Sequence, residues 1–128
     1  MSPTDAPLDQ RLRFITHNGK AIYEVDFTNC TSKEMLLLLD QIRASVSHHP
    51  PNSVLIFADF TGAQVDKKVA TRMKEVLVLD RPFVKRSAWI GTESVPEVFY
   101  EHFRNFSQRD FPIFKTRNEA LDWLTADS

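Results

Sequence analysis

The apolar positions along the chain change their period several times, which predicts strands and helices in alternation. An alternating run starts at Leu12 and a second strand-like run covers residues 21–27, with Asn18-Gly19 between them. Asn-Gly in that place is the strongest short-range signal of a β-hairpin. Residues 54–58 are apolar without interruption, which is typical of a buried central strand in a parallel sheet.

Helical spacing predicts four helices, each of which has a start signal. A capping box is a Ser or Thr followed three residues later by Glu or Gln, and it occurs three times: Thr31 with Glu34, Ser94 with Glu97, and Thr116 with Glu119. Asp66 is the expected N-cap of the second helix. Pro50 and Pro51 end the first helix near residue 48.

Further strand-like segments at residues 84–90 and 111–114 complete the order β-β-α-β-α-β-α-β-α. Such alternation is typical of a largely parallel sheet with right-handed crossovers. We therefore expect one α/β domain over residues 11–126, with an opening β-hairpin and a mostly parallel five-stranded sheet. Residues 1–10 are polar and aperiodic, which predicts a flexible tail. Trp89 and Trp123 are expected to be largely buried.

Composition narrows the class of protein. The chain has 128 residues, 42% of them hydrophobic, and a formal net charge of -1. These values fit one globular domain and argue against a protein built for nucleic acid, which would carry a basic excess. The single cysteine, Cys30, excludes an intrachain disulfide. With no transmembrane or secretory segment in the pattern, we expect a cytoplasmic location.

Candidate binding residues follow the central strand. In open α/β sheets, ligands and partners meet the carboxyl ends of the strands. Lys67 and Lys68 also lie in the first turn of the second helix, where the helix dipole disfavours cations, so an anionic partner is a hypothesis beside that of a solvated helix face. The predicted partner- or ligand-binding residues are Asp59, Thr61, Gly62, Asp66, Lys67, Lys68 and Arg72.

Two carboxylates at strand ends raise the question of catalysis. Asp26-Phe27-Thr28 echoes Asp59-Phe60-Thr61, although the echo is too short to define a repeat. If their strands are neighbours, Asp26 and Asp59 could hold Mg²⁺ and support a hydrolase or phosphotransfer enzyme. The simpler interpretation is that each Asp caps its own turn. No nucleophile motif or metal-ligand spacing accompanies them, so we predict no catalytic residue, metal site or cofactor.

The third helix is rich in aromatic residues. Val95, Val98, Phe99, Phe103 and Phe106 are expected to face one way. Most of these rings should belong to the core. Phe99, Tyr100 and Phe103 are also candidates for an apolar ligand site or a homodimer contact.

Taken together, the motifs NGKAIYEVDF, VLIFADFTGAQVD, PFVKRSAWIG and IFKTRNEALDWL resemble the STAS superfamily, specifically the small bacterial SpoIIAA-like or STAS/SEC14-domain proteins. The resemblance implies a bacterial cytoplasmic setting and a role in binding proteins or small ligands. The anti-sigma-factor antagonists of this superfamily carry Asp-Ser-Ser-Gly, with a phosphorylated serine, at the start of the second helix. Here the matching residues are Asp66-Lys67-Lys68-Val69, which lack that serine.

The resemblance therefore implies a non-enzymatic regulatory module for signalling that contacts a protein partner through the start of the second helix. An alternative is a carrier of lipid or another small apolar ligand, because some STAS-like relatives resemble the CRAL-TRIO lipid-binding domains. Contact with anionic lipid headgroups also fits the two lysines. The metal-dependent enzyme using Asp26 and Asp59 is the least favoured of the three hypotheses.

Overall fold

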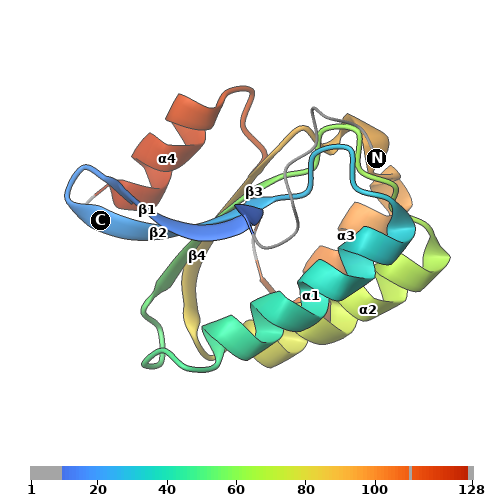
Figure 1. Ribbon diagram of the computed structural model, residues 1–128, viewed down its shortest axis with the longest axis horizontal. Coiled ribbons are helices and arrows are strands. Elements are labelled where there is room, and N and C mark those ends of the chain that lie inside the picture. Colours follow the sequence, from blue (N-terminus) through green and yellow to red (C-terminus); the bar gives the residue numbers. More distant parts are fainter. Residues whose placement is uncertain (1–9, 110, 127–128) are drawn as a thin grey trace.

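The computed structural model describes residues 10–109 and 111–126 and confirms the α/β class, with one mixed sheet of four strands in the order β1-β2-β3-β4 (Figure 1). The strands are β1 (Leu12–His17), β2 (Lys20–Asp26), β3 (Val54–Asp59) and β4 (Val84–Ile90). β1 and β2 form the expected antiparallel hairpin, whereas β2, β3 and β4 are parallel. Residues 1–9 of the predicted tail lie outside the described residues.

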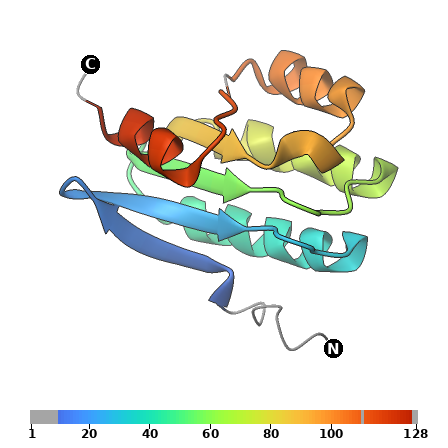
Figure 2. The same cartoon turned by 90° about the horizontal axis from the view of Figure 1, so that it is seen from above.

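The helices are divided between the two faces of the sheet. They are α1 (Ser32–Val46), α2 (Lys67–Asp80), α3 (Glu97–Ser107) and α4 (Arg117–Thr125), with a 3₁₀ turn, η2 (Thr92–Ser94), before α3. α1, α2 and α3 cover one face and α4 covers the other (Figure 2). Because successive strand residues point to opposite faces, Val25 joins the main core under α1–α3 and Ile22 joins the smaller core under α4.

Two arginine side chains attach α4 to the sheet. Arg117, in its first turn, pairs with the buried carboxylate of Glu24 on β2. Arg86 on β4 donates from Nη1 to the carbonyls of Trp123 (2.9 Å) and Ala126 (3.3 Å) at the other end of the helix. Both ends of α4 are therefore held by charged hydrogen bonds.

The predicted start signals were right for α1, α2 and α4 and wrong for α3. Thr31 and Glu34 form a complete capping box, and the carboxylate of Asp66 accepts from the Val69 N–H. Thr116 likewise accepts from the Glu119 N–H. The predicted box at Ser94 is absent: Pro96 is the N-cap of α3, and Ser94 instead donates its hydroxyl to the Phe60 carbonyl (3.0 Å).

The predicted fifth strand at residues 111–114 was wrong. This segment makes one isolated parallel bridge, between Trp89 and Ile113. Pro112 lacks an N–H and cannot continue a ladder, which explains why the pairing stops after one bridge. The sheet is therefore smaller, and less uniformly parallel, than expected.

The two tryptophans differ. Trp89 is buried, with its ring stacked on Phe111 at 4.6 Å and tilted against Phe60 at 4.6 Å. Trp123 is only half-buried, and the guanidinium of Arg86 lies over its ring at 5.2 Å. Burial of Trp89 is thus confirmed, and Trp123 is buried in part.

Candidate functional site

Asp26 and Asp59 lie side by side at the carboxyl end of the sheet, paired in parallel register. Oδ1 of Asp59 accepts from the Thr61 backbone N–H (3.0 Å) and hydroxyl (2.7 Å). Oδ1 of Asp26 accepts from the same two groups of Thr28, at 3.0 and 2.5 Å. The short sequence echo therefore encodes the same turn twice. In each turn the aspartate accepts hydrogen bonds from the threonine two residues later.

The loops that carry these turns are locked together. The Phe27 N–H donates to the Asp59 carbonyl (2.9 Å) and the Phe60 N–H to the Ile90 carbonyl (3.0 Å). Gly62 has φ +70°, and a Cβ there would collide with the Asn29 side chain. The predicted site residues Thr61 and Gly62 thus stabilise the turn. The Thr61 hydroxyl is engaged by Asp59, and Gly62 has no side chain that could contact a ligand.

Asp26 also has a cationic neighbour. The guanidinium of Arg11, which is 1% exposed, lies 3.8 Å from Asp26 Oδ1 and donates to the carbonyls of Asp26 and Thr28. Among residues 10–109 and 111–126, no group of three or more His, Cys, Asp or Glu could hold a metal ion. This arrangement favours turn capping as the role of the two aspartates.

Asp66 begins α2 and is engaged by its helix. Its carboxylate accepts from the Val69 N–H at 2.9 Å. That hydrogen bond, a further one from the Ser32 hydroxyl and the proximity of Lys68 together hold the pKa of Asp66 below its usual value. The next two side chains, Lys67 and Lys68, are exposed.

Arg72, another predicted binding residue, is engaged by carboxylates of two helices. Its Nη2 and Nε atoms bind Asp40 Oδ1 on α1, at 2.6 and 3.0 Å, and its Nη1 binds Glu75 on α2 at 2.9 Å. Arg72 therefore ties α2 to α1. Its charge is matched by two carboxylates, so it contributes little net charge to a partner surface.

Sequence reasoning missed Lys33. α1 and α2 run side by side and start at the same end of the sheet (Figure 1). Lys33 is the second residue after the cap of α1, as Lys68 is after the cap of α2. This equivalence is visible in the sequence once both caps are assigned. Within the described part of the chain, Lys33, Lys67 and Lys68 form no ion pair; we call these exposed residues the basic helix starts.

The aromatic candidates on α3 mostly hold that helix in place. Phe103 is fully buried, and the Tyr100 hydroxyl donates to the Phe111 carbonyl at 2.5 Å. Phe99 is half-buried against the main core. The expectation of a single apolar face was wrong at Val98 and Phe106, which are 52% and 61% exposed.

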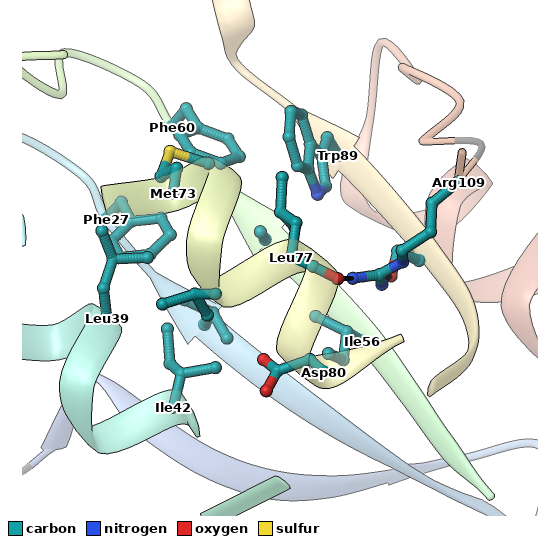
Figure 3. Close-up of a pocket in the computed structure, with 14 residues that line it drawn as sticks. Phe27, Leu39, Ile42, Ile56, Phe60, Met73, Leu77, Asp80, Trp89 and Arg109 are labelled. Atoms are coloured by element: carbon teal, nitrogen blue, oxygen red, sulfur yellow. Dashed lines mark hydrogen bonds between the residues drawn. The ribbon is translucent and has the colours of Figure 1, made fainter. Parts of the chain in front are cut away.

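An interior cavity of about 40 Å³ lies between the sheet, α1 and α2 (Figure 3). Aromatic rings line one side, while Asp80 and Arg109 bring charge to it. Burial raises the pKa of Asp80 to about 6 and lowers that of Arg109 to about 10. This is room for ordered water, which needs about 10 to 15 Å³ of such space per molecule. It is too small for an acyl chain in this conformation.

Comparison of the chain with models of protein families gave no match, and searches of curated proteins and of solved structures gave none either. In residues 10–109 and 111–126, no helix has the length and apolar character needed to cross a membrane. A proposal of function therefore rests on the geometry of the chain itself.

Proposed function

We propose that the chain is a non-catalytic binding module that docks an acidic segment of a partner protein on the basic helix starts. The observation that carries the proposal is the exposure of Lys33, Lys67 and Lys68 in two adjacent first turns without ion-pair partners in the described chain. Each helix N-terminus adds a partial charge of about +0.5. Lysine side chains and peptide dipoles thus favour the same anionic group.

The carboxylates nearby support binding over catalysis. Asp26 and Asp59 accept hydrogen bonds from their own turns, and Arg11 lies beside Asp26. A general base or a metal ligand must present its oxygen atoms to the reacting group. These two aspartates are used instead to fix the loops that position α1 and α2.

The resemblance to STAS proteins suggests what the two lysines of α2 do. In the anti-sigma-factor antagonists, the same helix start carries the serine whose phosphorylation switches partner binding. With Lys67 and Lys68 in that place, the surface keeps its positive charge at all times. We infer a regulatory module in a bacterial cytoplasm whose partner contact is not switched by phosphorylation at this point.

Native mass spectrometry of the chain purified from its own host tests the proposal. We expect a co-purified protein with the wild type and its loss from the Lys67→Glu/Lys68→Glu variant. The matched control is Lys85→Glu/Lys115→Glu, which makes the same change of charge at two exposed positions outside the helix starts. A partner that stays bound to the first variant contradicts the proposal. A co-purified lipid without a protein supports the carrier hypothesis instead.

A further inference from the structure

The two edges of the sheet are covered differently. β4, at one edge, receives the isolated bridge between Trp89 and Ile113. β1 lies at the other edge, on the outside of the sheet (Figure 2), and among the described residues only β2 pairs with it. An open strand edge presents backbone N–H and C=O groups that a further strand can bind. The outer side of β1 can therefore accept another strand.

The hydrogen bonds of the hairpin show which backbone groups of β1 face outward. The Asp26 N–H donates to the Arg11 carbonyl at 2.8 Å, so these two residues form a hydrogen-bonded pair. In an antiparallel ladder such pairs alternate with pairs that exchange no hydrogen bond. The series of alternate residues that starts at Arg11 therefore directs its backbone groups toward β2. The other series directs its N–H and C=O groups outward and consists of Leu12, Phe14 and Thr16.

β1 lacks the features by which edge strands usually avoid pairing. These features are proline, lysine, a bulge or a very short strand. β1 has six residues, Leu12–His17, without proline or lysine, and its register with β2 is continuous. At its centre Phe14 is 49% exposed, although its ring stacks on Tyr23 at 4.9 Å. The edge thus combines outward-facing backbone groups with a large exposed apolar side chain.

The charges beside this edge are matched within the chain. Arg13 pairs with Glu24 at 2.8 Å, and His17 Nε2 lies 2.7 Å from Asp122 Oδ1. An edge with matched charges has no strong attraction for an acidic or a basic peptide. A second copy of the chain would bring the same charges to the contact, and like charges directly opposite each other destabilise a strand pair. Matched charges remove that repulsion and therefore favour pairing with a second copy.

We propose that β1 pairs with β1 of a second copy, in antiparallel orientation across a two-fold axis at Phe14. This axis places the two copies of Phe14 opposite each other, and Leu12 of each copy opposite Thr16 of the other. All three residues belong to the outward-facing series, so each N–H meets a C=O of the other copy. The contact is isologous, as in most homodimers, and joins the two sheets into one continuous sheet.

The size of the contact sets its expected strength. One pair of six-residue strands with one aromatic pair buries less than the roughly 1,200 Å² of a standard interface. We therefore expect a reversible dimer with a dissociation constant of roughly 100 µM. Most of the chain should be monomeric at about 20 µM and dimeric at about 1 mM.

Sedimentation velocity of the full chain over this concentration range, with backbone amide hydrogen exchange followed by NMR, tests the proposal. The amides of Leu12, Phe14 and Thr16 should exchange about fourfold more slowly at the higher concentration, because pairing protects them. The amides of Arg13 and Ile15, which face β2, should exchange at the same rate at both concentrations. This alternation along one strand is specific to pairing at the edge.

Phe14→Lys is the decisive variant, because the two-fold axis brings the two new ammonium groups together. We expect it to raise the dissociation constant about tenfold or more. Phe106→Lys makes the same change at a phenylalanine of α3 that is 61% exposed, and should alter the constant less than about twofold. Thr16→Pro removes an N–H that β2 does not use, so the chain should stay folded and dimerise about fivefold less tightly.

A chain that stays monomeric at about 1 mM overturns the proposal. So does a dimer that forms without slower exchange of the outward-facing amides, or one that Phe14→Lys and Phe106→Lys weaken equally. Protection of these amides at both concentrations would show that the chain itself covers the edge, which also contradicts the proposal. The test is separate from that of the proposed protein partner, because the basic helix starts lie on α1 and α2 and take no part in the pairing of β1.

Discussion

The two ends of the sheet use charged residues in opposite ways. At the carboxyl end, Asp26, Asp59 and Asp66 each accept a hydrogen bond from a backbone N–H two or three residues further along the chain. At the amino end, Lys20 of β2 and Lys85 and Arg86 of β4 line one pocket of about 280 Å³, and no Asp or Glu of the described chain lines it.

The difference shows that a polar residue at the end of a strand, where sites are expected, does not by itself form a binding site. The carboxyl end has the strand termini where sites are usually found in α/β sheets, yet its carboxylates stabilise turns. The amino end is not where that rule points, yet cationic side chains from β2 and β4 line a pocket there. Hydrogen-bond partners separate the two ends better than position in the fold does.

The largest expected effect tests whether the two ends depend on one core. Trp89 lies near the carboxyl end of β4 and packs in the main core against Phe60 and Phe111. Trp89→Ala should lower the free energy of unfolding by about 3 to 5 kcal/mol, measured by urea denaturation. Trp123→Ala, at a half-buried ring, should lower it by less than half as much. Equal losses would contradict the difference in burial between the two rings.

The next effect concerns Asp80, the buried carboxylate that lines the interior cavity. Its pKa is about 6 in the folded chain and 3.8 in the reference state, so the folded protein binds the proton more tightly. Stability is therefore lost as pH rises from about 4 to about 6, by roughly 3 kcal/mol. Asp80→Asn should remove this loss and make the chain more stable at pH 7.

Urea denaturation at several pH values between 4 and 7 measures the effect of Asp80→Asn. Glu101→Gln, on the exposed surface of α3, makes the same change of net charge and is the control. A stability difference between wild type and Asp80→Asn that stays constant across this range would show that Asp80 is not the titrating group.

A smaller effect compares the two equivalent turns. Asp59→Ala removes two hydrogen bonds to Thr61 and should lower the unfolding free energy by about 1 kcal/mol. Asp26→Ala also removes the carboxylate 3.8 Å from the buried Arg11, so we expect about 2 kcal/mol. Thermal melts of both variants measure the difference. A larger loss of unfolding free energy in Asp59→Ala than in Asp26→Ala would contradict this expectation.

The smallest effect tests the basic helix starts. Lys67 lies in the first turn of α2, where a cation opposes the helix dipole. Lys67→Ala should therefore raise the unfolding free energy by about 0.3 kcal/mol. It should also weaken capture of the partner protein. A stabilised variant that binds its partner as well as the wild type would leave the lysine without a role in docking.

Local patterns predicted the parts of the structure that local chemistry decides. The caps at Thr31 and Asp66 formed because each side chain reaches an N–H three residues away. The two wrong elements also have local causes, because Pro96 displaced the cap from Ser94 and Pro112 interrupted the last strand. The positions of Pro96 and Pro112 in the sequence are enough to predict both differences.

The contacts of the charged side chains were harder to predict because their partners are far away in the sequence. Arg72 meets Asp40, 32 residues earlier, and the pairing became visible only when α1 and α2 were packed. The side chains that line the pocket at the amino end of the sheet come from segments as far apart as Lys20 and Ala126, which no spacing pattern connects. The motif PFVKRSAWIG contained two of their residues, but it indicated only a strand.

The position of α4 has a consequence for motion. It is a nine-residue helix that stands alone on its face of the sheet, where Leu121 and Leu124 pack in the smaller core and Arg117 and Arg86 hold its two ends. Elements with few buried contacts open locally before a protein unfolds as a whole. The amide hydrogens of α4 should therefore exchange with solvent sooner than those of α1.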